Sequence, residues 1–187
     1  GEYVGHENVT HRTYRPQTEG DSGLIAEAAE LIANAKRPVF YSGGGVINSG
    51  DRASDALRAF VRATGFPITS TLMGLGAYPA SDKQFLGMLG MHGTYEANLA
   101  MAHCDVMIAI GSRFDDRVTG RLDAFSPNSK KIHVDIDPSS INKNVMVDIG
   151  IVGDCGLVTE ALMAAWKKQK GTPDKAAHAS WWGDIEK

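Results

Sequence analysis

Short apolar runs alternate along the chain with segments whose apolar residues recur at helical spacing. The runs are rich in Val, Ile and small residues, which is typical of strands, and the segments between them predict amphipathic helices. Strands are expected at residues 39–42, 67–70, 105–111, 131–136 and 149–153, and helices at residues 24–32, 53–64, 94–102 and 155–169. The run over residues 105–111 is apolar on both faces, which indicates the centre of a parallel sheet.

This alternation predicts an α/β fold, a doubly wound, Rossmann-like parallel sheet of five to six strands with helices on both faces. We interpret residues 1–21 as a polar linker or arm and residues 22–169 as one domain. Residues 170–187 are expected to form a polar tail or the start of an interdomain linker. Residues 71–93 hold five glycines and three methionines without a clear period, and we interpret them as a long functional loop. Residues 112–123 are expected to form a charged loop.

Composition excludes several classes of protein. Of 187 residues, 43% are hydrophobic and 22% charged, and the net charge of -3 leaves no basic excess for a nucleic acid or an anionic membrane. The chain has two cysteines and no CxxC motif, which excludes a disulfide scaffold and a zinc ribbon and indicates a reducing compartment such as the cytoplasm. No residues have the spacing of a metal site. Apolar runs are too short to cross a bilayer. Because the chain starts with Gly1, we expect it to be a piece of a longer protein.

The unusual residues follow the predicted strands, where ligands bind in doubly wound sheets. Gly43, Gly44 and Gly45 follow the first strand, but GGGVIN is not GxGxxG, and no acidic residue ends the second strand. The sequence therefore disfavours a standard NAD site. Two interpretations stay open: backbone N–H groups that approach a ligand, or a tight turn from strand to helix, which the motif alone slightly favours.

Two arginines and two aspartates crowd the end of the third strand, in the segment GSRFDDR. Arg113 and Arg117 suit a diphosphate or a carboxylate, and Asp115 and Asp116 would orient them or accept from ligand hydroxyls. The alternative is a solvated cluster of salt bridges. The position at a strand end favours a functional role.

The last two strands end at acidic residues. Asp135 is placed to accept hydrogen bonds from two ribose hydroxyls. Asp154 either accepts from an adenine amino group or caps the final helix. Elsewhere, the methionines and leucines of residues 72–91 offer either a polarisable wall for a flat ring or ordinary core, and His92 is either a ligand contact or a structural histidine.

Several long motifs together resemble one family over residues 12–166. They are RPVFYSGGGV, TSTLMGLGAYPASDKQFLGMLGMHGTYEAN, GSRFDDRVTG, HVDIDPSSINKN and IVGD, and they are similar to the central domain of the acetohydroxyacid synthase (acetolactate synthase) catalytic subunit. The resemblance implies a thiamine-diphosphate-dependent transferase. Such an enzyme condenses pyruvate with pyruvate or 2-oxobutyrate, with loss of carbon dioxide, at the start of branched-chain amino-acid biosynthesis.

The resemblance also implies that this domain binds FAD, which takes no redox part in the main reaction. Arg117 corresponds to a contact for the second substrate's carboxylate, and Met91, Asp116 and Arg117 to positions that contact herbicides. Ser112 departs from the Ala or Val expected there. The implied FAD contacts are Arg12, Gly43, Gly44, Gly45, Thr71, Leu72, Leu89, Gly90, Met91, His92, Gly111, Ser112, Arg113, Asp115, Arg117, Val118, Asp135, Ile136 and Asp154.

Thiamine diphosphate and Mg²⁺ are bound in the family by flanking N- and C-terminal domains, which carry the activating glutamate and the GDG motif. The resemblance therefore implies that this segment alone has no catalytic residue, and that its parent is a homo-oligomer with a regulatory subunit. Two alternatives stay open. One is the middle domain of another thiamine-dependent carboligase, oxidase or decarboxylase, which holds FAD, ADP or nothing; the other is a stand-alone nucleotide-binding module.

Overall fold

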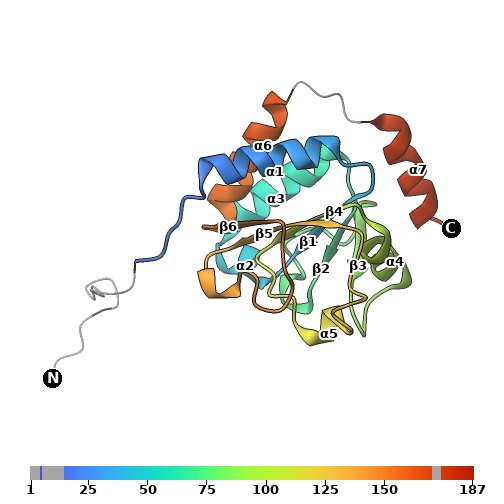
Figure 1. The fold of residues 1–187 in the computed structure, drawn as a ribbon, viewed down its shortest axis with the longest axis horizontal. Helices are drawn as coiled ribbons and strands as arrows, with labels where there is room; N and C mark the ends of the chain where they lie inside the picture. Colours follow the sequence, from blue (N-terminus) through green and yellow to red (C-terminus); the bar gives the residue numbers. More distant parts are fainter. Residues whose placement is uncertain (1–4, 6–14, 170–173) are drawn as a thin grey trace.

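The centre of the fold is a parallel sheet of six strands. We describe it from a computed structural model that covers residue 5, residues 15–169 and residues 174–187. The strands lie in the order β3-β2-β1-β4-β5-β6 (Figure 1). Their bounds are β1 (Pro38–Ser42), β2 (Ile68–Ser70), β3 (Phe85–Met88), β4 (Val106–Ile110), β5 (Lys130–Asp135) and β6 (Ile149–Val152). The predicted α/β doubly wound sheet is confirmed.

The strand order contains one reversal, between β1 and β4. The chain moves outward from β1 through β2 to β3, and it then returns to place β4 on the other side of β1. In such sheets the connections that leave the two central strands diverge and open a crevice beyond the carboxyl ends of the strands. The site should therefore be sought beyond Ser42 and Ile110.

Three helices cover one face of the sheet: α1 (Ser22–Asn34), α3 (Asp51–Thr64) and α6 (Cys155–Lys168) (Figure 1). Alternate strand residues point into this layer, with Ile108 and Ile110 of β4 among its buried side chains. The other face is covered by α4 (Tyr95–His103) and α7 (Lys175–Ile185), and it receives Met107 and Ala109 of β4. The central strand is thus buried on both faces, as its sequence predicts.

Side-chain caps start α1 and α4 close to where the helical pattern of the sequence begins. Asp21 accepts from Leu24 N at the start of α1, and Thr94 accepts from Ala97 N at the start of α4. Gly65 ends α3 in the left-handed conformation, with φ 74°. These local signals fix where the helices begin and end, and therefore which loops reach the carboxyl ends of the strands.

Three segments differ from the sequence-based expectation. Residues 71–93 are not one continuous loop, because they contain the short helix η2 (Leu72–Gly74) and the edge strand β3. The charged loop contains the helical turn α5 (Asp116–Thr119). The expected polar tail contains α7, whose Trp181 is buried and donates from its indole N–H to Pro38 O at 3.1 Å. The short helices α2 (Gly44–Asn48) and η3 (Pro138–Ser140) complete the fold.

Both cysteines, Cys104 and Cys155, are free thiols buried in the interior of the fold. Across the described helices, none is long and apolar enough to cross a membrane.

Candidate functional site

The loops that follow β1 and β4 cross in direct backbone contact. Gly43 N donates to Ile110 O at 2.9 Å, and Gly45 N donates to Gly111 O at 3.0 Å. A Cβ atom at Gly43 would lie 2.1 Å from Gly111 O, and one at Gly45 would lie 2.7 Å from Gly111 Cα. The tight-turn interpretation therefore accounts for Gly43 and Gly45, whose N–H groups are committed to the protein. Gly44 faces η2 instead, where a Cβ would lie 3.0 Å from Met73 Cβ.

The turn after β4 holds Arg113 at the surface beside this crossing. Its backbone is anchored by Phe114, which has φ 52° and packs edge-on against the rings of Tyr41 and His133. Asn144 Nδ2 donates to the carbonyl oxygens of Arg113 and Phe114, at 3.2 Å each. Arg113 itself pairs with Asp115 at 2.9 Å, with 71% of its side chain exposed. Such an exposed pair contributes roughly 0–1 kcal/mol, so an anionic ligand can compete with Asp115 for the guanidinium.

The side chain of His133 bonds to the backbone of this turn at Ser112. Burial lowers the pKa of His133, outweighing the opposing effects of its hydrogen bond to Ser112 and of Asp135. The ring is therefore neutral near pH 7, and its Nε2 donates to Ser112 O at 2.7 Å because a carbonyl only accepts. Neither His133 nor Asn144 was singled out from the sequence. His133 occupies an inward position of a strand, which is the one sequence signal that could have found it.

Acidic residues lie at the ends of β5 and β6. Asp135 is 8% exposed, and its Oδ1 accepts from Asp137 N at 2.9 Å. Its Oδ2 lies 3.8 Å from His133 Nε2. Asp154 caps α6, because its Oδ1 accepts from Gly156 N and Leu157 N. Of the two interpretations of Asp154, the cap is confirmed. Ile136 lies beside Asp135 and is 39% exposed.

Large apolar side chains lie exposed near the ends of β2 and β3. Leu72, Met73 and Met91 are 67%, 74% and 66% exposed. Thr71 accepts from Gly74 N and caps η2. Leu89 is 3% exposed and packs in the core on the α4 side of the sheet. Of the methionines and leucines expected to form either a wall for a flat ring or ordinary core, Leu72, Met73 and Met91 are exposed.

The turn after β3 contacts α5. Met91 N donates to Arg117 O at 3.0 Å, and a Cβ at Gly90 would lie 2.6 Å from the same oxygen. His92 and Arg117 are exposed, and Val118 is half-buried. Two segments that lie far apart in the sequence therefore present Met91 and Arg117 close together.

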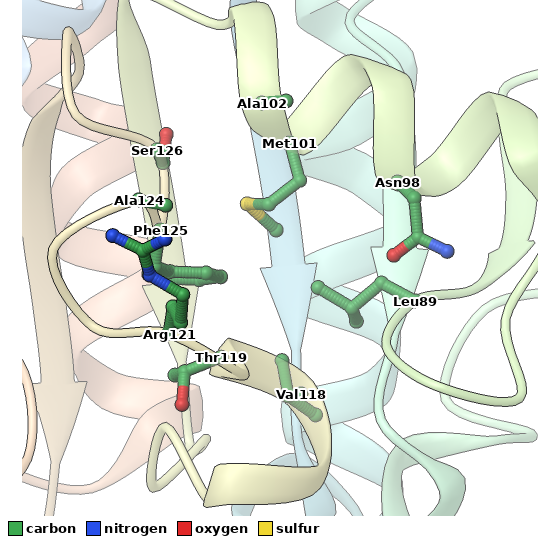
Figure 2. Close-up of a pocket in the computed structure, with 10 residues that line it drawn as sticks. All are labelled: Leu89, Asn98, Met101, Ala102, Val118, Thr119, Arg121, Ala124, Phe125 and Ser126. Carbon is green, nitrogen blue, oxygen red and sulfur yellow. The ribbon is translucent and has the colours of Figure 1, made fainter.

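Two hollows lie beside these loops. One has a volume of about 180 Å³ and lies between α4 and the loop after α5 (Figure 2). Its walls include Leu89, Met101 and Phe125. The other, of about 320 Å³, lies against Phe114, Asp115 and Asn144. Among residues 15–169 and 174–187, no group of three or more His, Cys, Asp or Glu side chains could hold a metal ion.

The strand ends after which predicted site residues occur follow one another along the sheet, and we call this row of strand ends the carboxyl edge. Because the strand order is β3-β2-β1-β4-β5-β6, the apolar residues, the glycine crossing with Arg113, and Asp135 follow one another in space. Neighbouring strands lie about 4.8 Å apart, so six strand ends extend over about 24 Å. Arg12 lies outside the described residues.

The comparisons with a family model and with individual proteins agree with each other. The family described as "Thiamine pyrophosphate enzyme, central domain" matches residues 25–162. The chain is 45% identical over 184 residues to the acetolactate synthase isozyme 3 large subunit of Escherichia coli, which covers 98% of this chain and 32% of that protein. It is 47% identical over 173 residues to an acetolactate synthase of Mycobacterium avium, which covers 92% of this chain and 27% of that protein. The chain therefore spans about a third or less of the length of these relatives.

Proposed function

The chain belongs to the central-domain family of thiamine pyrophosphate enzymes, and from that premise we propose that it is the FAD-binding middle domain of an acetolactate synthase catalytic chain. The observation that carries the proposal is the strand order. It brings six segments that are separated in the sequence into one row along the carboxyl edge. A long, narrow ligand such as an extended dinucleotide matches a row, whereas a compact ligand would need residues from two or three adjacent strands.

The chemistry along the row supports FAD. The nearly buried carboxylate of Asp135 suits the ribose hydroxyls of the adenosine half. Arg113, whose pairing with Asp115 is weak and exposed, suits the diphosphate. Leu72, Met73 and Met91 offer an apolar, polarisable surface to the flavin ring. Because the N–H groups of Gly43 and Gly45 are already bonded, the diphosphate charge in this proposal depends mainly on Arg113.

The parent activity follows from the family as part of the same proposal. The complete protein condenses pyruvate with a second 2-oxoacid, with release of carbon dioxide, in the cytoplasm. Thiamine diphosphate and Mg²⁺ supply the decarboxylation chemistry from domains outside this segment. Within it, the exposed Arg117 beside Met91 is placed to bind the carboxylate of the second substrate. The expected homo-oligomer and regulatory subunit belong to that complete protein.

Titration of the protein with FAD, ADP and FMN tests the FAD site and its orientation. Arg113→Gln should weaken FAD and ADP about tenfold or more, because the diphosphate loses its charged partner. Asp135→Asn should weaken FAD and ADP but leave FMN unchanged. Leu72→Asp should weaken FAD but leave ADP unchanged. Quenching of flavin fluorescence, or calorimetry for ADP, measures each dissociation constant.

A matched control is available for the arginine. Arg121 is also exposed and also pairs with an aspartate two residues on, Asp123, but it follows α5 and lines the hollow beside α4, not the crossing of Gly43 and Gly45 with Gly111. Arg121→Gln should therefore leave all three dissociation constants unchanged. Equal effects of the two arginine substitutions would contradict the proposal. Tight ADP binding without FAD binding would favour the middle domain of a different thiamine-dependent enzyme.

A further inference from the structure

The turn between β3 and α4 follows a path that only glycine permits. Gly90 has φ 92°, and its missing Cβ would lie 2.6 Å from Arg117 O. A Cβ at Gly93 would lie 2.3 Å from Met88 O. Gly93 N also donates to Gly90 O at 3.0 Å. The backbone is therefore packed closely on both sides, and a small change of its path would move Met91 and His92.

One side chain of α4 fixes the path of this turn. Asn98 Oδ1 accepts from Gly90 N at 2.8 Å, and Asn98 Nδ2 donates to Gly90 O at 3.1 Å. The same Nδ2 donates to Thr94 O at 3.0 Å. Both backbone polar groups of Gly90 are thus held by a single carboxamide, which lies beside Leu89 (Figure 2).

The result is an exposed tip with a fixed base. Met91 N is bonded to Arg117 O of α5, while the Met91 side chain is 66% exposed. His92 is exposed as well. Because these hydrogen bonds hold the base in the protein itself, binding at the tip has less ordering entropy to repay.

A purely helical role would not explain Asn98. Asparagine is a weak helix former, and it commonly bonds to the carbonyl four residues earlier in a helix. Asn34 of α1 makes that bond, from Nδ2 to Glu30 O at 2.9 Å, and within the described part of the chain its side chain bonds to no neighbouring turn. The two bonds from Asn98 to Gly90 are additional to this local bond.

We propose that Asn98 is a positioning residue, which holds the Met91–His92 tip against α5 in the geometry that meets the ligand. The ligand contact rests on the proposed function, since it takes the ligand to be FAD. The rigidity of the turn does not depend on it.

The test uses the protein at its full encoded length and the substitution Asn98→Asp, with Asn34→Asp as the matched control. An ionised carboxylate keeps the acceptor for Gly90 N, but it loses the donor and faces two carbonyl oxygens. At about pH 8, amide exchange at Gly90 and Met91 should be at least about tenfold faster than in the wild type, and FAD binding about tenfold weaker. At about pH 3, below the usual aspartate pKa of about 3.9, protonation of the introduced carboxyl restores an O–H donor, so the exchange ratio should return toward one.

The outcomes separate the two claims. Asn34→Asp should leave the amides of the turn unchanged at both pH values and the affinity for FAD unchanged at the higher one. Unchanged exchange at Gly90 and Met91 in Asn98→Asp would overturn the proposal, as would faster exchange with unchanged FAD affinity. If the wild type does not bind FAD, the proposed function fails, and the exchange ratio with its pH dependence still decides whether Asn98 holds the turn.

Discussion

Gly45 shows how strongly a single residue can constrain the centre of this fold. The loops after β1 and β4 cross with no side chain between them, and the hydrogen bond from Gly45 N to Gly111 O holds them together. The sequence predicts that this stretch is a tight turn or a ligand-binding loop. It cannot reveal which backbone lies opposite, because Gly111 is 66 residues farther along the chain.

Gly45→Ala should destabilise the protein by about 1–3 kcal/mol, because the new methyl group meets backbone that cannot rotate away. The control is Gly183→Ala in α7, where a Cβ would have no neighbour within 4 Å. There the free energy of unfolding should stay the same or rise by up to about 1 kcal/mol, since alanine favours a helix. Urea unfolding of both variants measures the difference, and equal stabilities would contradict the close crossing.

His133 makes the stability depend on pH in a predictable direction. Burial holds its pKa below the usual 6.5, so between these two pKa values the unfolded state binds more protons than the folded state. Stability due to this residue is complete above pH 6.5 and is lost as the pH falls toward the pKa of the folded state.

Replacement by an uncharged donor, His133→Gln, should flatten the fall in unfolding free energy between about pH 7 and pH 5. Urea unfolding at several pH values measures the slope for each protein. The comparison uses slopes, so any constant loss of stability in the variant does not affect it. Parallel slopes for the two proteins would mean that His133 is not the group that titrates.

At the scale of elements, the hydrophobic pattern predicts the interior strands and the capped helices, and it misses β3 and α7. Strand β4 carries five buried residues in succession, and such an unbroken apolar run is typical of a strand in the centre of a parallel sheet. Strand β3 is a short edge strand of half-buried residues that contains Gly87 with φ 91°, so its sequence carries no clear alternation. Helix α7 shows little separation of apolar and polar faces, although Trp181 and Ile185 are buried.

Helix α7 contributes to the stability of the domain through Trp181. This residue is 3% exposed, and it bonds the carbonyl that begins β1. Trp181→Ala should cost about 3–5 kcal/mol, as large-to-small changes in cores do. Trp181→Phe should cost about 1–3 kcal/mol, because the buried Pro38 carbonyl loses its donor.

Trp182 serves as the control on the same helix. Its indole N–H donates to Gly65 O at 3.0 Å in an exposed position, where water can replace it. Trp182→Phe should therefore change the midpoint of thermal unfolding much less than Trp181→Phe does. If neither substitution at Trp181 lowers that midpoint, α7 does not contribute to the stability of the domain.

At the scale of the whole molecule, the site depends on the strand order, which local patterns do not encode. The sequence predicts that unusual residues follow each strand, and the resemblance to a family supplies the flavin. Placing Leu72, Arg113 and Asp135 in one row requires the reversal between β1 and β4, which becomes visible only when the strands are paired.

The residues that hold the row could not be predicted for a related reason. Phe114 has a positive φ and its ring packs against Tyr41, Phe125 and His133, which come from separate parts of the chain. Asn98 and Asn144 donate to backbone carbonyl groups, and the sequence does not indicate which carbonyl groups lie near them. Sequence reasoning therefore identifies the residues at the surface of the site more readily than those that support them.

The central claim is that the carboxyl edge binds one extended dinucleotide, and a crystal structure of the protein grown with FAD tests it most directly. The account predicts continuous density along the edge, with the adenosine at Asp135, the diphosphate at Arg113 and the flavin ring against Leu72 and Met91. FAD density at any other surface, or a reversed orientation with the flavin at Asp135, would contradict it.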